Sequence, residues 1–198
     1  MLTHWTNLIK TDCKVVRIGN DYVYPIFKCG CTTLFVNADQ ILVNEELQNL
    51  PIIKVILRDP EERFIAGVNK YCDDNNVAIK DVVKQIKKER VADKHFVPQW
   101  VWLFHLYRFY KGNVSILPMS QLNKYIKQKH NKNLKNFPKE WEEAVGKQFG
   151  KARNINEEKK PVPIINEFVS NDKEIIKNFM HKEVNLKTII KDYRHVLS

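Results

Sequence analysis

The chain has 198 residues, of which 43% are hydrophobic and 28% charged, and this balance predicts one soluble globular domain over residues 1–198 rather than a disordered chain. The net charge of +10 favours acidic partners but does not choose among a nucleotide, an acidic glycan, nucleic acid and a membrane surface. No apolar stretch is long enough to span a membrane, and residues 1–14 lack the basic start and apolar run of a signal peptide.

The first expected elements are two strands joined by a tight turn. Residues 14–18 have strand character, residues 19–21 read Gly-Asn-Asp, and residues 22–27 are aromatic and β-branched. After Gly30, apolar residues recur at helical spacing as far as Leu42. The pattern therefore predicts a strand that passes through a tight turn into the N-terminus of a helix.

The segment between this strand and the expected helix has the composition of an anion-binding loop. It consists of Lys28, Cys29, Gly30, Cys31, Thr32 and Thr33. Glycine lets the backbone approach a ligand, the hydroxyls and the amides of a helix N-terminus can donate to a phosphate, and the lysine adds a charge. The Walker A pattern GxxxxGK[ST] is absent from the chain. Alone, the segment fits an ordinary strand–turn–helix with a solvated lysine equally well.

A second segment, residues 52–71, has a related organisation. Residues 52–57 form an apolar run broken by one lysine, which is typical of a buried parallel strand. Asp59 can cap the helix that follows, and Pro60 suits its first turn. Arg58 and Arg63 would then lie at the carboxyl edge of the sheet, where open α/β sheets bind ligands.

Further along, a turn is expected at residues 73–76, followed by a helix whose apolar face runs from Ile79 to Ile86. The other face of this helix is basic and is either solvated or a rim that attracts an acidic acceptor; it carries Lys80, Lys84, Lys87, Lys88 and Arg90. Residues 95–110 are rich in aromatics, most of them expected in the core and some available to stack on an adenine or a sugar.

The remaining elements complete an alternation of strands and helices. Residues 114–117 read as a short strand ended by Pro118, and helices are expected at 120–129, 140–149, 174–180 and 186–196. Alternating apolar strands and helical patterns predict an α/β fold in which a central, mainly parallel sheet is flanked by helices. The expected architecture is a P-loop-like arrangement of three layers.

Four segments, in chain order, resemble motifs of the carbohydrate sulfotransferase family. KxGxTT spans residues 28–33, RDPxxRF spans 58–64, D-x-H-F-x-P-Q spans 93–99, and an aspartate–tyrosine pair stands at 192–193. In that family the first loop grips the 5′-phosphosulfate of 3′-phosphoadenosine-5′-phosphosulfate (PAPS), and the second grips its 3′-phosphate. The resemblance covers most of the chain and implies PAPS as sulfuryl donor, with a carbohydrate-type hydroxyl as acceptor.

The resemblance also implies roles for individual residues. Lys28 would stabilise charge on the leaving group, and Arg58 would hold the 3′-phosphate. Arg153 lies in a polar loop, residues 150–163, similar to a family loop near the nucleotide. The family usually has a serine eight positions after the arginine of RDP, and here that position is Ala66. Either Arg58 and backbone groups alone hold the 3′-phosphate, or the donor specificity has loosened.

Sulfuryl transfer, like phosphoryl transfer, depends chiefly on positioning and charge stabilisation, and we expect no metal. His95 is the expected general base because imidazole titrates near neutral pH and because the resemblance of residues 93–99 places it in the family's acceptor-side segment. A structural hydrogen-bonding role for His95 is the alternative, and Asp93, Glu62 and His105 are the other candidate bases.

Two rival classes of function remain open. A different phosphate-handling enzyme, such as a nucleotide kinase, is disfavoured because the Walker A lysine and magnesium serine are missing. A basic nucleotide- or polyanion-binding protein, including a degenerate sulfotransferase fold that binds without turnover, is kept open by Ala66. Binding of nucleic acid is not expected because no recognised motif for it occurs.

The cysteines bear on the compartment. Cys13, Cys29, Cys31 and Cys72 are interpreted as reduced thiols of a cytoplasmic protein, because their spacing suits neither a disulfide framework nor a zinc site. Cys31, at the expected helix N-terminus, is either a reactive thiol of lowered pKa or a small residue that fits the turn.

Overall fold

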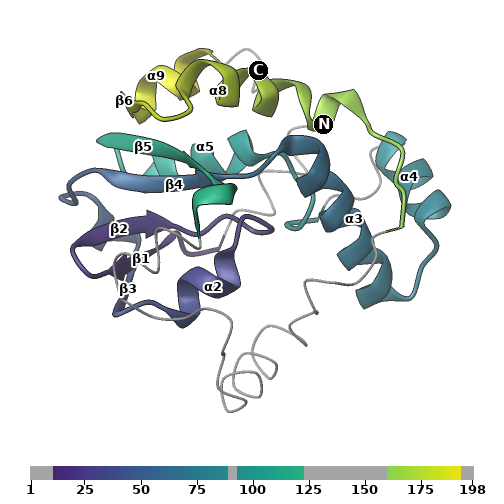
Figure 1. Ribbon diagram of the computed structural model, residues 1–198, viewed down its shortest axis with the longest axis horizontal. Helices are drawn as coiled ribbons and strands as arrows, with labels where there is room; N and C mark the ends of the chain where they lie inside the picture. Colours follow the sequence, from purple (N-terminus) through teal and green to yellow (C-terminus); the bar gives the residue numbers. More distant parts are fainter. Residues whose placement is uncertain (1–10, 89–92, 123–159, 193–198) are drawn as a thin grey trace.

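A computed structural model describes residues 11–88, 93–122 and 160–192 (Figure 1). Arg153, Tyr193 and the helix expected at 140–149 lie outside these residues. Within the described part, an open, mixed sheet of six strands is flanked by helices, in the order β3-β1-β2-β4-β5-β6. The strands are β1 (Lys14–Ile18), β2 (Asp21–Tyr24), β3 (Gln40–Val43), β4 (Ile53–Leu57), β5 (Asn113–Pro118) and β6 (Glu183–Asn185).

The expectation of a mainly parallel sheet is wrong for the sheet as a whole. The pairs β2–β4 and β4–β5 are parallel, whereas β1–β2, β1–β3 and β5–β6 are antiparallel. The short turn between β1 and β2 permits only antiparallel pairing, since a parallel pair needs a long crossover. The three strands expected to be parallel nevertheless lie side by side at the centre, with Tyr24 opposite Val55 and Val55 opposite Ile116.

Helices cover both faces of the sheet. The main helices are α2 (Cys31–Val36), α3 (Pro60–Asn75), α4 (Ile79–Lys87), α5 (Gln99–Phe109), α8 (Ser170–Phe179) and α9 (Leu186–Asp192). Short 3-10 turns occur at Asn44–Leu47, Met119–Gln121 and Asn166–Phe168. In Figure 1, α2 lies on one side of the sheet, and α8 and α9 lie on the other. No described helix is long and apolar enough to cross a membrane.

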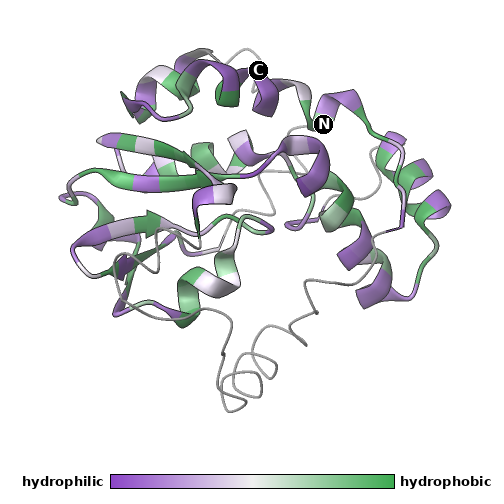
Figure 2. Cartoon of the chain, viewed as in Figure 1, coloured by the Kyte–Doolittle hydropathy of each residue, from purple (hydrophilic) through white to green (hydrophobic). Residues whose placement is uncertain are grey.

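Two hydrophobic cores follow from the alternation of side chains along the strands. On one face, Val55, Leu57 and Ile116 join the apolar sides of α3, α4, α5, α8 and α9. On the other face, Ile56 packs with Leu34 of α2 and with residues of β1 and β2. Figure 2 shows hydrophobic and hydrophilic residues alternating along both the strands and the helices. The sheet is therefore fixed from both sides.

The helix expected to reach Leu42 ends earlier, at Val36. The side-chain amide of Asn37 donates to the Thr33 carbonyl at 2.8 Å, and the Asp39 N–H donates to the Arg17 carbonyl at 2.8 Å. These bonds turn the chain into β3, which pairs with β1, so the apolar residues near Leu42 belong to a strand. The turn expected at 73–76 is also wrong, because α3 continues to Asn75 before it ends.

Candidate functional site

The loop after β2 has the tight turn that the sequence predicts. The Cys29 N–H donates to the Ile26 carbonyl at 3.0 Å, and Lys28 has a left-handed φ of 64°. Gly30 follows with a φ of 80°, and a Cβ added there would lie 2.2 Å from Cδ2 of Leu122. Glycine is therefore required at this position for both conformation and space.

Helix α2 begins at Cys31 and has only 6 residues, so any affinity of this loop for an anion depends mainly on its side chains and amides. Lys28 and Thr33 are half-buried and Thr32 is exposed. Burial raises the pKa of the Cys31 thiol, which contradicts a lowered pKa. We therefore interpret Cys31 as a small residue that fits the turn. All four cysteines are free, as predicted.

The segment after β4 also folds as predicted. Asp59 caps α3 by accepting a 2.9 Å hydrogen bond from the Glu62 N–H, and Pro60 occupies the first turn. The Arg58 guanidinium donates from Nε and Nη2 to the Glu62 carboxylate, both at 3.2 Å. The Arg58 side chain is 16% exposed and that of Glu62 65% exposed. An anion that binds Arg58 at these atoms must therefore displace an exposed carboxylate.

Arg63, on α3, is buried and not exposed at the edge of the sheet. Its side chain is buried, and it donates from Nε to the Phe27 carbonyl at 3.0 Å and from Nη1 to the Val97 carbonyl. Its Nη2 has no hydrogen-bond partner among the residues described. Arg63 thereby links the main chain at Phe27, in the loop after β2, to the main chain at Val97.

Gln99, the last residue of the 93–99 segment, joins the loop that follows β2 to the loop that follows β4. Its Oε1 accepts from the Cys29 thiol at 3.2 Å and from the Arg58 N–H at 2.9 Å. Its Nε2 donates to the Arg58 carbonyl at 2.9 Å. One buried side chain thus links the loop after β2 to the loop after β4, which are neighbours because β2 and β4 pair in parallel.

Asp172, at the start of α8, holds Gln99 in turn. Its carboxylate accepts from the Gln99 N–H at 2.7 Å and from the Trp100 N–H at 2.9 Å, which caps α5. Burial raises the pKa of Asp172 to about 6, although the Arg63 charge and the hydrogen bonds from Gln99 and Trp100 act in the opposite direction. This carboxylate ties the C-terminal helices to the site.

His95 lies beside the first loop. Its ring nitrogen Nδ1 is 2.6 Å from the Asp93 carboxylate, and its ring is edge-on to Phe27, the neighbour of Lys28, with centroids 5.4 Å apart. Burial raises the pKa of Asp93, but the hydrogen bonds from His95 outweigh it, so the net shift is downward. A Cβ added to Gly67 of α3 would lie 2.2 Å from the His95 carbonyl oxygen, so this loop requires a glycine beneath it.

Two further predicted positions, Ala66 and His105, are buried. Ala66 is buried on α3. His105 is also buried, and it forms hydrogen bonds with the Tyr24 hydroxyl and the Thr11 carbonyl, so it is a packed structural histidine.

The roles of Gln99 and Asp172 were not predicted from the sequence. Gln99 belongs to the 93–99 segment, but its partners Cys29 and Asp172 are 70 and 73 residues away in the sequence. No local pattern could therefore predict these contacts.

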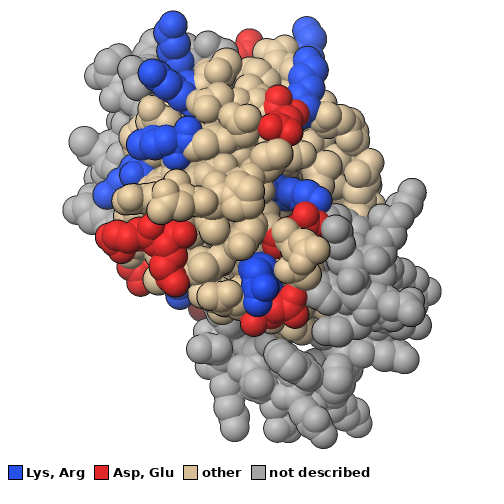
Figure 3. Space-filling view, turned by 90° about the vertical axis from the view of Figure 1, so that its left-hand side faces the viewer, with Lys and Arg blue, Asp and Glu red and all other residues tan. Residues whose placement is uncertain are grey.

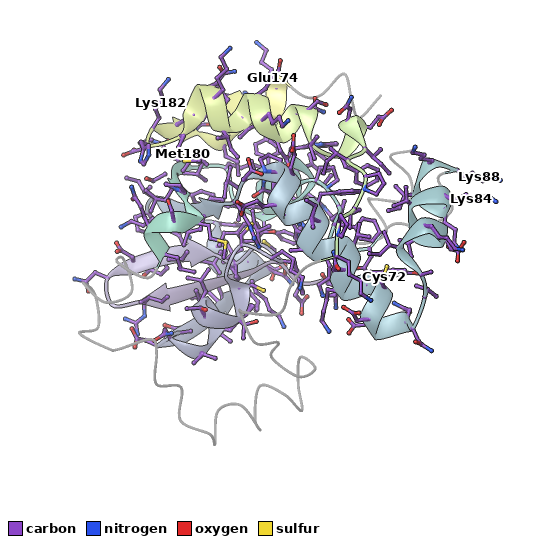
Figure 4. All side chains as sticks on the ribbon, turned by 45° about the vertical axis from the view of Figure 1, so that its right-hand side comes forward. Cys72, Lys84, Lys88, Glu174, Met180 and Lys182 are labelled. Atoms are coloured by element: carbon purple, nitrogen blue, oxygen red, sulfur yellow. The ribbon has the colours of Figure 1, made fainter. Side chains whose placement is uncertain are left out.

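Charge is spread over the surface in both signs on the face that Figure 3 shows. Lys84 on α4 and Lys88, which directly follows this helix, are exposed and extend outward from the body of the protein (Figure 4). No group of three or more histidines, cysteines or acidic residues that could hold a metal ion occurs in the described part of the chain. The basic outer face of α4 is therefore available to solvent or to an acidic ligand.

Comparison with protein-family models, with curated proteins and with solved structures gave no match.

Proposed function

We propose that this protein is a PAPS-dependent sulfotransferase, built on a single P-loop-like domain, that transfers a sulfuryl group to a hydroxyl of a carbohydrate-type acceptor. One observation carries the proposal. The two loops that resemble the phosphate loops of carbohydrate sulfotransferases lie next to each other, joined through Gln99, at the carboxyl ends of β2 and β4. This is the edge at which open α/β sheets bind nucleotides.

The donor would lie across these two loops. Lys28, the loop amides and the hydroxyls of Thr32 and Thr33 would hold the 5′-phosphosulfate, and Arg58 would hold the 3′-phosphate. Neighbouring strands are about 4.8 Å apart, so one nucleotide can span both loops. A guanidinium gives a charge-assisted, bidentate contact with phosphate, which compensates for the alanine at position 66.

The chemistry requires one proton acceptor and one charge to stabilise the leaving group. The acceptor oxygen forms a bond to sulfur while the bond from sulfur to the bridging oxygen breaks, and that electron pair stays on the 5′-phosphate. Lys28 stabilises this charge. His95 takes the hydroxyl proton at Nε2, because Asp93 accepts a hydrogen bond from Nδ1–H and keeps Nε2 as the free base.

A second candidate is a protein of this fold that binds the nucleotide without turnover. It is favoured by Ala66 and by the pairing of Arg58 with Glu62, both of which weaken the grip on a 3′-phosphate. For either candidate we propose the cytoplasm as the compartment, because four free thiols suit a reducing environment.

The test is calorimetry with 3′-phosphoadenosine-5′-phosphate (PAP) and with adenosine 5′-phosphate, followed by an acceptor screen with PAPS. The proposal predicts tighter binding of PAP and sulfuryl transfer to at least one hydroxyl-bearing glycan. Lys187→Ala removes one positive charge on the exposed side of α9, away from the two loops. It controls for the net charge of the protein and should bind PAP as the wild type does. Binding of PAP without transfer to any acceptor would favour the second candidate, and equal affinities for the two nucleotides would contradict both.

A further inference from the structure

The Gln99 side chain is 1% exposed, and its carboxamide uses its full hydrogen-bonding capacity. The oxygen accepts two hydrogen bonds, from the Cys29 thiol and the Arg58 N–H. The nitrogen donates two, to the Arg58 carbonyl and, at 3.4 Å, to the Asp172 carboxylate. An amide has two acceptor and two donor positions, so this side chain fits its surroundings in one orientation only.

These bonds fix Arg58 at a point where the sheet no longer does. The pairing of β4 with β5 ends at Leu57 opposite Pro118, so Arg58 is the first residue beyond the ladder. Because one amide bonds both its N–H and its carbonyl, the main chain of Arg58 has little freedom to rotate. The Cα–Cβ bond of Arg58 therefore has a fixed direction at the sheet edge.

The first loop is tied to the same group. Cys29 stands between Lys28 and Gly30, and its buried thiol donates to the oxygen that also accepts the Arg58 N–H. Oε1 of Gln99 therefore joins the two loops directly, in addition to the pairing of β2 with β4. Arg63 holds the first loop separately, through the Phe27 carbonyl.

We propose that Gln99 is a positioning residue that holds the Lys28 loop and Arg58 at a fixed separation, so that both ends of the donor are gripped at once. This role rests on the proposed function. Interactions held in place before binding cost less ordering on binding, so the Gln99 amide raises the preference for the 3′-phosphorylated nucleotide without touching it. A purely structural role would lower stability and leave that preference unchanged.

The experiment compares Gln99→Met with the matched exposed variant Gln85→Met on α4. Two quantities are measured: the ratio of the affinities for PAP and adenosine 5′-phosphate, and the hydrogen-exchange rate of the Arg58 amide. In Gln99→Met the ratio should fall at least tenfold and the Arg58 amide should exchange at least tenfold faster, while the Val55 amide in β4 stays protected. Gln85→Met should change neither quantity.

The outcomes separate this role from the function on which it rests. A wild-type protein that binds the two nucleotides equally would contradict the proposed function and, with it, the role of Gln99. A wild-type preference that persists in Gln99→Met, despite faster exchange at Arg58, would overturn the positioning role alone. If Gln99→Met does not fold, Gln99→Asn keeps the site polar but is one methylene too short to reach Arg58, and the same two results decide.

Discussion

Replacement of Arg58 and replacement of its partner Glu62 should change the proposed binding of the 3′-phosphate in opposite directions. Arg58→Ala removes the guanidinium that we assign to the 3′-phosphate. Glu62→Gln keeps the size of the side chain but removes the charge that occupies Nε and Nη2 of Arg58. The cap of α3 remains in both variants, because it joins the Asp59 carboxylate to the main-chain N–H of residue 62.

The magnitudes follow from exposure and charge. The Glu62 side chain is 65% exposed and pairs with Arg58 four residues away, an arrangement that contributes about 0.3–0.5 kcal/mol. A hydrogen bond to a charged group contributes about 1.5–3 kcal/mol. Arg58→Ala should therefore weaken PAP binding by about 10- to 150-fold, whereas Glu62→Gln should strengthen it by about twofold.

The assay is titration calorimetry of both variants with PAP and with adenosine 5′-phosphate at one fixed, low ionic strength. The loss in Arg58→Ala should appear with PAP and be small with adenosine 5′-phosphate, because only PAP carries the 3′-phosphate. An equal loss for the two nucleotides would refute the assignment of Arg58 to the 3′-phosphate. A weaker affinity in Glu62→Gln would refute the competition between Glu62 and the ligand.

Three further predictions concern the loops and the buried carboxylate. Lys28→Ala should lower kcat/KM for any accepted substrate, by an amount equivalent to about 1.5–3 kcal/mol of lost transition-state stabilisation, with little change in melting temperature. Wild-type activity in this variant would show that the assignment of Lys28 is wrong. Asp172 has a pKa raised from 3.8 to about 6. Protonation of this carboxyl therefore stabilises the folded protein at low pH, and this stabilisation is lost as the pH rises through about 6. From pH 7 to pH 5 the wild type should therefore gain stability relative to Asp172→Asn in urea titrations, by at most about 1.4 kcal/mol per pH unit, and parallel profiles would contradict the shift. Gly67→Ala should displace the loop that carries His95 and reduce turnover more than PAP affinity, and unchanged kcat would argue against His95 as the base.

The central strands could be predicted from sequence because their signals are local. The apolar run that became β4, the glycine turn between β1 and β2, and the Asp59 cap of α3 each depend on adjacent residues. The edge strands could not be predicted in the same way. The apolar residues of β3 continue the helical spacing of α2, and only its long-range pairing with β1 makes that segment a strand.

In the candidate site, too, local features could be predicted from the sequence and long-range contacts could not. The sequence predicts Arg58 at the carboxyl edge of the sheet, and the resemblance implies roles for Lys28 and His95 in the same site. In the structure the Arg58 N–H donates to Gln99, whose segment also carries His95, and the His95 ring contacts Phe27 beside Lys28. Arg63 was expected beside Arg58 at the ligand-binding edge of the sheet, but it is buried and donates to two main-chain carbonyls. The partners of Gln99 come from three separate segments, so no spacing in the sequence announces them.

An amide NMR titration of the protein with PAP tests directly whether the two loops form one nucleotide site. We expect the amides of residues 28–33 and of residues 58, 59 and 61–63 to shift together and to saturate with a single dissociation constant. A titration in which only one of these loops responds, or in which neither does, would contradict a single nucleotide site.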